Sequence, residues 1–310
     1  MVNEIRTIYF KELSNIDEIF EEKNKLPIFL KKMMLFFKKI FCIVTVDGRG
    51  FYILPYKNLT SFLNIKLFFI KKILIKLDSQ VVLSKKLDSV QKLKDMCKNS
   101  NIKLVKGVKL ANYLMPEMIQ YICKMTGKEK EKQEITLLME NRNYEFEKMI
   151  IELASQVRRI QIVTNKIGQF KKLENDLENE YGLLCQITNN KRKSLLKSKI
   201  IINFDSSQEL LNQFAINPNA IVIDINEKTQ IIAKAFCGIH IYDYQMNSDN
   251  KELPTSIFDI KKIYEARMLD KNYAQIRKIV KEENLRIINL IGKKGIIDRR
   301  EYTSISKKLG

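Results

Sequence analysis

The feature that most constrains the fold of this chain is an alternation of apolar runs and amphipathic stretches that begins at residue 134. The apolar runs read "EITLLM", "RRIQIVTN", "GLLCQITN", "SKIIINFD" and "NAIVIDIN". Strands that are apolar on both faces and alternate with helices form a mainly parallel sheet covered by helices on both sides. We therefore predict a doubly wound, Rossmann-like α/β domain over residues 134–250, with "CGIHIYDYQ" as its sixth strand.

Two of the intervening stretches have the spacing of helices that bury one face. In "EFEKMIIELASQV" and "QFKKLENDLENEYG", apolar residues recur at positions i, i+3, i+4 and i+7. Gly182 is placed to end the second helix. The shorter runs "QELLNQF" and "TQIIAKAF" are also predicted to be helical. The expected buried positions of the two longer helices are Phe146, Met149, Ile150, Leu153, Val157, Phe170, Leu173, Leu177 and Tyr181.

The remaining sequence predicts a smaller α/β domain over residues 1–130 and a helical tail over residues 255–310 that packs on the domain junction. The strand candidates of the first domain are "EIRTIYF", "FCIVTVDG", "GFYILPY", "SQVVLSK" and "NIKLVKG", and "DGRG" is typical of a hairpin turn. A helix, "KLANYLMPEMIQYICKM", should lead into the second domain. Pro116 either kinks this helix or marks its true start.

The charge of the chain is strongly positive and unevenly distributed. The formal net charge is +19, and most of the excess falls in residues 23–109. Such a surplus attracts polyanions, although solvated lysines on every surface of a lysine-rich protein would give the same composition. In "PIFLKKMMLFFKKIF", lysines and Met/Phe side chains occupy opposite sides of a helix, which fits an anionic membrane, a partner's groove or an ordinary surface helix. We predict a polyanion or protein partner for residues 23–109, with peripheral membrane contact as an alternative.

The cysteines and the hydropathy favour a cytoplasmic protein without a metal site or a membrane span. The five cysteines are scattered and never form a CxxC pair, which indicates neither a disulfide framework nor a zinc site. The chain shows no secretion leader and no uncharged apolar run of the length that crosses a bilayer.

The loop after the first strand of the Rossmann-like domain lacks the usual device for binding a dinucleotide. A pyrophosphate binds where backbone N–H groups at a helix N-terminus point at it, and glycines allow the close approach. The loop "MENRNYEF" has no glycine, although Asn141 or Asn143 can make the turn and Arg142 offers a cationic grip. Three acidic side chains fall in or beside it: Glu140, Glu145 and Glu147. We therefore expect a structural turn and no bound cofactor.

Three segments resemble the shikimate dehydrogenase-like proteins over about residues 134–245. They are "VTNKIGQFKKL", "SKIIINFDS" and "AIVIDINEKTQIIAKAFCGIHI". The resemblance implies a Rossmann domain that binds NADP in an oxidoreductase. In that family, polar residues after the second strand hold the adenosine 2′-phosphate, which would give this role to Asn165 and Lys166, preceded by Thr164. An ordinary polar turn at a strand end accounts for the same residues.

A fainter similarity concerns the catalytic lysine of that family. "GFYILPYK" is similar to the segment that ends in the proton-transfer lysine, which would assign this role to Lys57. The Asn and Thr of that motif are replaced here by Phe51 and Ile53, and no segment matches the second catalytic residue. The alternative is a turn at the end of a strand, with Lys57 solvated.

Other candidate groups are few. His240 is the single histidine and lies in a strand-like run, where a half-buried histidine bonded to the backbone is the ordinary case. Asp205, Asp224 and Glu227 fall near strand ends, where they either act on a ligand or cap a turn. We favour a non-catalytic binding or assembly protein that acts through its basic first domain. The alternative is a divergent NADP-dependent oxidoreductase, and the sequence specifies no substrate, pathway or oligomeric state.

Overall fold

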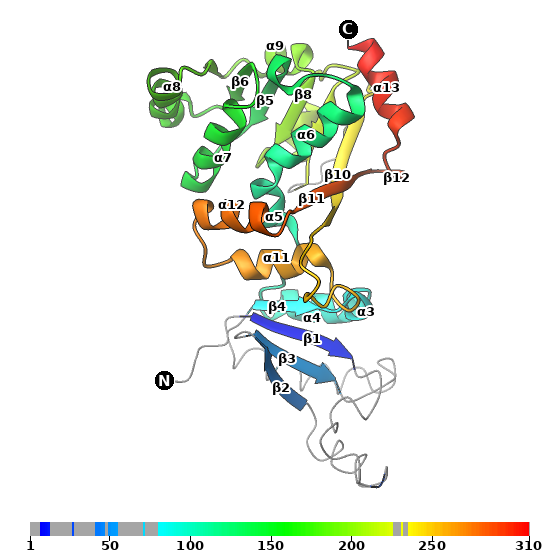
Figure 1. Cartoon of the computed structure of the whole chain (residues 1–310). Helices are drawn as coiled ribbons and strands as arrows, with labels where there is room; N and C mark the ends of the chain where they lie inside the picture. The colour runs from blue at the N-terminus through cyan, green and yellow to red at the C-terminus, as the bar shows by residue number, and fades with distance from the viewer. Residues whose placement is uncertain are drawn as a thin grey trace. The chain divides into compact units, whose positions relative to one another are not determined.

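The computed structural model divides the chain into two compact units (Figure 1). The first comprises residues 1–107 and 252–269, and the second comprises residues 108–251 and 270–310. Residues 108–130 thus belong to the second unit, and the residues after 250 are shared between the two. The structure describes residues 7–12, 27, 41–46, 49–54, 71, 80–225, 231 and 235–309, without the side chains of residues 12, 41–46, 49–54, 145 and 210.

The second unit contains a mainly parallel sheet with the strand order of a Rossmann domain. Its strands are β5 (Glu134–Leu138), β6 (Arg159–Val163), β7 (Cys185–Thr188), β8 (Ile200–Asn203), β9 (Ile221–Ile223) and β10 (Ile239–Asn247). They lie in the order β7-β6-β5-β8-β9-β10, and all neighbours are parallel. Counted from β5, this is the order of the doubly wound dinucleotide-binding fold. The structure confirms the α/β prediction and all six predicted strands.

The helices between these strands are α7 (Tyr144–Ala154), α8 (Ile167–Tyr181), α9 (Lys191–Lys197) and α10 (Gln208–Asn212). The apolar spacing of α7 and α8 predicted their buried faces, except that Phe146 is only partly buried and Tyr181 is 46% exposed. Tyr181 is the last residue of α8, and the chain turns away at Gly182. Gly182 has a φ of 62°, the left-handed conformation that ends many helices.

Helices α5 (Val108–Tyr113) and α6 (Met115–Thr126) replace the single helix that was predicted before the second domain. Pro116 lies in the first turn of α6, so it marks a helix start, where its missing N–H group costs nothing. Gly127 ends α6 with a φ of 69°, and the short 3-10 helix η3 (Lys130–Lys132) leads into β5.

The prediction that residues 272–291 are helical throughout was wrong in its second half. Helix α12 (Tyr273–Glu282) is followed by β11 (Arg286–Gly292) and β12 (Gly295–Ile296), and then by α13 (Arg299–Lys308). Strand β11 pairs antiparallel with β10. Ile287 and Leu290 bury their side chains in this strand. The segment forms a strand because β-branched residues such as Ile287 favour a pleated surface and because β10 offers an unpaired edge.

The first unit contains a sheet in the order β2-β3-β1-β4. Its strands are β1 (Thr7–Glu12), β2 (Phe41–Val46), β3 (Arg49–Leu54) and β4 (Gln80–Leu83). β2 and β3 are antiparallel, with Val46 paired to Arg49, which agrees with the predicted hairpin. "NIKLVKG" forms only an isolated bridge between Leu104 and Val81. Helices α3 (Lys85–Asp88), α4 (Gln91–Asn99) and α11 (Ile260–Met268) complete the described part of this unit.

Several predicted features lie outside the described residues. They are the amphipathic lysine-rich helix, apart from its end residues Pro27 and Phe41, the proposed catalytic Lys57, the strand-end Glu227 and most of "TQIIAKAF". In the part of the chain that is described, none of the helices combines the length and hydropathy needed to cross a membrane.

Candidate functional site at the carboxyl edge of the sheet

The candidate site lies where the strand order reverses, between β5 and β8. In open α/β sheets, ligands bind outside the carboxyl ends of the strands at this switch point. The loops that follow β5, β6 and β8 meet there, and they carry most of the residues that the sequence assigned to a cofactor. Hydrogen bonds join these loops to one another at the switch point.

The carboxylate of Asp205, directly after β8, occupies the amides of the loop after β5. Its Oδ1 accepts a hydrogen bond from the main-chain nitrogen of Glu140 at 2.7 Å. Its Oδ2 accepts one from the main-chain nitrogen of Asn141 at 2.8 Å and another from the Asn141 side chain at 3.0 Å. These main-chain N–H groups lie in the turn that leads into α7, the turn that holds the pyrophosphate in a dinucleotide-binding domain. A carboxylate of the protein itself therefore satisfies them.

A second carboxylate, that of Glu140, joins three neighbouring segments. Its Oε2 accepts a hydrogen bond from the main-chain nitrogen of Asn165 at 3.1 Å, and its Oε1 lies 2.7 Å from the Nζ atom of Lys191. The Lys191 side chain is only 4% exposed. A buried ammonium group needs an anionic partner, because removal from water is otherwise costly. Glu140 supplies that partner and links the loops after β5 and β6 to the start of α9.

The structure brings four of the predicted cofactor residues together at this edge. The ammonium group of Lys166 donates to Asn141 Oδ1 at 2.8 Å. Thr164 is fully buried, and its hydroxyl oxygen accepts a hydrogen bond from the main-chain nitrogen of Lys166 at 3.0 Å. Asn165 is held by Glu140. The loop after β5 and the loop after β6 are thus joined by hydrogen bonds between their polar residues.

Arg142 and Asn143 have local roles in α7. The Nε atom of Arg142 donates to Glu147, and its Nη1 donates to the carbonyl oxygen of Gln169 at 3.1 Å. The hydrogen bond with Glu147 raises the pKa of the Arg142 guanidinium above its ordinary value. The carbonyl oxygen of Asn143 accepts the hydrogen bond from the main-chain nitrogen of Glu147, which is the position of an N-cap residue.

A buried polar cluster lies beside the switch point, at the ends of β8 and β9. Asp224 is fully buried and accepts a hydrogen bond from Asn203 Nδ2 at 3.1 Å. The Nε2 atom of His240, on β10, lies 3.5 Å from Asp224 Oδ2. Asn203 also accepts a hydrogen bond from the main-chain nitrogen of Ser206 at 2.9 Å. The Nε2 atom of His240 therefore faces a carboxylate rather than a backbone group.

Sequence reasoning left the role of Asp205 open and missed Lys191. Asp205 was one of several strand-end carboxylates expected either to act on a ligand or to cap a turn, and it caps the loop of a neighbouring strand. Lys191 is one of 55 Lys and Arg residues, and nothing in its neighbourhood in sequence marks it as buried. In the described part of the chain, no group of three or more His, Cys, Asp and Glu side chains is arranged to hold a metal ion.

No protein-family model matches the sequence, and no curated protein matches it. Similar solved structures include a chain of dipicolinate synthase from Bacillus halodurans, with 13% identity, coverage of 76% of this chain and 88% of that chain, and a TM-score of 0.38. L-tryptophan dehydrogenase from Nostoc punctiforme has 10% identity, coverage of 98% and 86%, and a TM-score of 0.34. A shikimate dehydrogenase in complex with NADP+ has 10% identity, coverage of 98% and 96%, and a TM-score of 0.32. The similarity to shikimate dehydrogenase and related dehydrogenases is weak and divergent. The strand order of the second unit is what shows a Rossmann-like fold.

Proposed function

We propose that this protein is a non-catalytic binding or assembly protein whose Rossmann-like domain holds no dinucleotide at its switch point. The observation that carries the proposal is the carboxylate of Asp205, which accepts hydrogen bonds from the main-chain N–H groups of Glu140 and Asn141. Hydrogen bonds to charged groups contribute about 1.5 to 3 kcal/mol each. A dinucleotide would have to break these hydrogen bonds of Asp205. The free energy lost would offset much of the roughly 8 kcal/mol that corresponds to micromolar binding.

The partner that we propose is a polyanion or an acidic protein surface bound through residues 23–109. The excess of Lys and Arg in this region supports the proposal. Among its described residues, Lys92 and Lys98 expose their side chains on α4. Binding of this kind is driven by phosphate or carboxylate charge and carries little sequence specificity. A cytoplasmic location is part of the proposal, and it is supported by the free thiols of Cys97, Cys123, Cys185 and Cys237.

The alternative is a divergent NADP-dependent oxidoreductase. Its support is the exposed Lys166 after β6, at the place where the resemblance puts the 2′-phosphate of the cofactor. In this alternative, Asn165 and Lys166 bind the ribose phosphate, Arg142 lies near the pyrophosphate, and Lys57 transfers a proton. Binding would require Lys166 to leave Asn141 and Asp205 to leave the loop amides.

A fluorescence titration with NADPH separates the two functions. We expect the wild-type protein to show no saturable change up to millimolar NADPH, because the loop amides are already bonded. The Lys166→Glu variant should then behave as the wild type does. Saturable NADPH binding that Lys166→Glu weakens would overturn the proposal and support the oxidoreductase.

Retention on a heparin column tests the polyanion partner. We expect the salt concentration of elution to fall for the double variant Lys92→Glu/Lys98→Glu, because contacts with a polyanion are screened and counterion-dependent. The matched control is Lys171→Glu/Lys172→Glu, which makes the same charge change at exposed positions of α8 in the second unit. An equal loss of retention in both variants would contradict a binding surface in residues 23–109.

A further inference from the structure

One face of the sheet in the second unit carries a row of polar side chains. Thr136 on β5, Gln161 on β6 and Gln186 on β7 are direct neighbours in register. In parallel strands, residues in register project from the same face. Two residues further along these strands, Leu138 and Val163 belong to an apolar cluster on that face. The face is therefore apolar toward the carboxyl edge and polar toward the amino edge.

The short helix α9 explains why Gln161 and Gln186 are left partly or fully exposed, whereas Thr136 is buried. α9 connects β7 to β8, the position of the crossover in this fold. Its seven residues span about 10 Å, whereas the five residues of β5 span about 16 Å. Leu195 of α9 packs in the apolar cluster with Leu138 and Val163. The helix thus covers the carboxyl half of the face. At its end, Ser198 covers Thr136 of β5 through a hydrogen bond of 2.6 Å, and Gln161 and Gln186 on the outer strands stay open.

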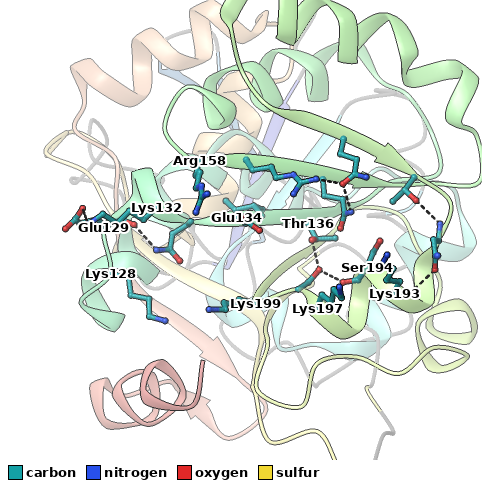
Figure 2. A pocket seen from close by; sticks show the side chains of 18 of the residues that line it. Lys128, Glu129, Lys132, Glu134, Thr136, Arg158, Lys193, Ser194, Lys197 and Lys199 are labelled. Atoms are coloured by element: carbon teal, nitrogen blue, oxygen red, sulfur yellow. Dashed lines mark hydrogen bonds and ion pairs between the residues drawn. The ribbon is translucent and has the colours of Figure 1, made fainter. Parts of the chain in front are cut away.

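A pocket of about 860 Å³ opens over the amino half of this face (Figure 2). Seven basic and two acidic side chains line it. Figure 2 shows the labelled basic groups lying around Glu134 and Thr136. The basic residues are Lys128, Lys132, Arg158, Arg159, Lys193, Lys197 and Lys199, and the acidic residues are Glu129 and Glu134. Concave walls with a surplus of one charge focus the electric field and attract ions of the opposite charge.

Several of these cations remain available for a ligand. Within the described residues, the side chains of Arg158, Lys193 and Lys197 are exposed and form no ion pair. Burial, together with the positive charge of Lys199, lowers the pKa of the Lys128 ammonium group below its ordinary value. An anion that binds between these ammonium groups reduces the electrostatic repulsion between them.

The neutral groups of the pocket floor suit hydroxyl groups. Gln161 donates to Gln186 Oε1 at 3.3 Å, and Arg159 donates to the same oxygen. Among the described residues, this leaves the Nε2 donor of Gln186 and the Oε1 acceptor of Gln161 without a hydrogen-bond partner. A hydroxyl group both accepts and donates hydrogen bonds, so it can satisfy both atoms.

None of the described residues that line the pocket is aromatic. Proteins that bind single-stranded nucleic acid or nucleotides commonly stack the bases on aromatic side chains. We propose that this pocket binds a compact, multiply phosphorylated polyol, with the phosphate groups held by the basic rim and the hydroxyl groups by Gln161 and Gln186. This ligand site is separate from both the switch point and residues 23–109.

Calorimetric titration of the full chain with an inositol trisphosphate, which combines phosphate groups with free hydroxyl groups, tests the proposal. We expect saturable binding that weakens at least about tenfold, equivalent to about 1.4 kcal/mol, in the Lys193→Glu/Lys197→Glu variant. The variant Lys171→Glu/Lys172→Glu carries the same charge change on α8 and does not line the pocket. It should bind within about twofold of the wild type. Equal weakening in both variants, or no saturable binding by the wild type, would overturn the site.

A neutral substitution distinguishes a polyol phosphate from an anion of any kind. The Gln161→Leu variant keeps the charge of the pocket and removes one hydroxyl-binding group. It should weaken binding of the inositol trisphosphate and leave binding of inorganic tripolyphosphate unchanged, because only the inositol trisphosphate carries free hydroxyl groups on carbon. An equal effect on the two probes would contradict the polyol. Tighter binding of a single-stranded RNA oligonucleotide that also depends on Lys193 and Lys197 would identify the pocket as a nucleic-acid site instead.

Discussion

The Oδ2 atom of Asp205 lies 2.8 Å from the main-chain nitrogen of Asn141. The contact joins the loop after β8 to the loop after β5, across the point where the strand order reverses. An acidic side chain thus stands where a dinucleotide-binding domain of the same strand order places a phosphate. The geometry is that of an anion site whose anion belongs to the protein.

Replacing Asp205 should destabilise the second unit. Asp205→Ala leaves main-chain N–H groups of Glu140 and Asn141 without their acceptor, so we expect the free energy of unfolding to fall by about 2 to 3 kcal/mol. Asp205→Asn retains one oxygen acceptor and should cost less. Urea denaturation measures both effects. The control is Glu209→Ala in α10, an exposed substitution that should change stability by less than about 0.5 kcal/mol. An Asp205→Ala loss no larger than that of the control would contradict the capping role.

The pair formed by Glu140 and Lys191 should show strong energetic coupling. Lys191→Met removes a buried cation and leaves the Glu140 carboxylate, which is 17% exposed, without its partner. We expect a loss of about 3 kcal/mol, because breaking a buried pair from one side is costly. The double variant Glu140→Gln/Lys191→Met should lose less than the sum of the single changes in denaturant unfolding. Additive losses would show that the two side chains do not stabilise one another.

Arg277 on α12 should be a second electrostatic anchor of this unit. Its guanidinium donates to Glu117 at 2.8 and 3.0 Å, and it also contacts Glu152. Arg277→Ala leaves two largely buried carboxylates facing each other, so we expect a loss of about 3 to 5 kcal/mol in urea unfolding. Arg277→Lys keeps the positive charge but lacks the planar guanidinium fork. Its free energy of unfolding should therefore lie between those of the wild type and Arg277→Ala. Wild-type stability in Arg277→Ala would exclude the anchor.

Alkaline pH should destabilise the same region through Tyr273. Burial and the hydrogen bond that its hydroxyl donates to Glu152 raise the pKa of Tyr273 above its ordinary value. Since the folded-state pKa is raised, this contribution to stability is complete below the unfolded pKa of about 10 and is lost as the pH rises beyond it. Thermal unfolding between pH 8 and 11 should show a smaller decline for Tyr273→Phe than for the wild type. Parallel declines would contradict the assignment.

Buried thiols should resist alkylation in the native protein. Burial raises the pKa of the Cys97 thiol to about 11, and the pKa of the Cys123 thiol is also about 11, mainly because of burial. Since only the thiolate reacts, iodoacetamide at pH 8 should modify the exposed Cys237 well before these two. Peptide mass spectrometry gives the order of modification, and all three should react in urea. Early modification of Cys97 in the native state would contradict its burial.

The sequence predicts the central strands of the second unit well, because a strand buried on both faces is largely apolar. All four residues of β8 are buried, for example. The same reasoning fails for β11, because its spacing fits either a helix or a strand that is buried on one face. The exposed edge of β10, which is formed far away in the sequence, decides between the two.

The candidate site could be predicted only in part. The sequence assigned Asn141, Asn165 and Lys166 to one cofactor site, the last two through the resemblance, and these residues lie at one edge of the sheet. The sequence could not predict that Asp205 reaches the amide of Glu140, because that hydrogen bond joins residues 65 positions apart and depends on the conformation of both loops. The burial of Lys191 is equally non-local, since its ammonium group pairs with Glu140, 51 positions away in the sequence.

The division of the chain into two discontinuous units has a consequence for its biosynthesis. Helix α11 belongs to the first unit, where Lys262 pairs with Asp88 at 2.7 Å, and the ring of Phe258, just before α11, lies 5.2 Å from that of Tyr9. Most of the second unit is therefore translated before the first unit receives its last helix. Each growing polypeptide should leave the ribosome with an unfinished amino-terminal sheet, which makes chaperone holding during translation more important for this protein than for one with contiguous domains.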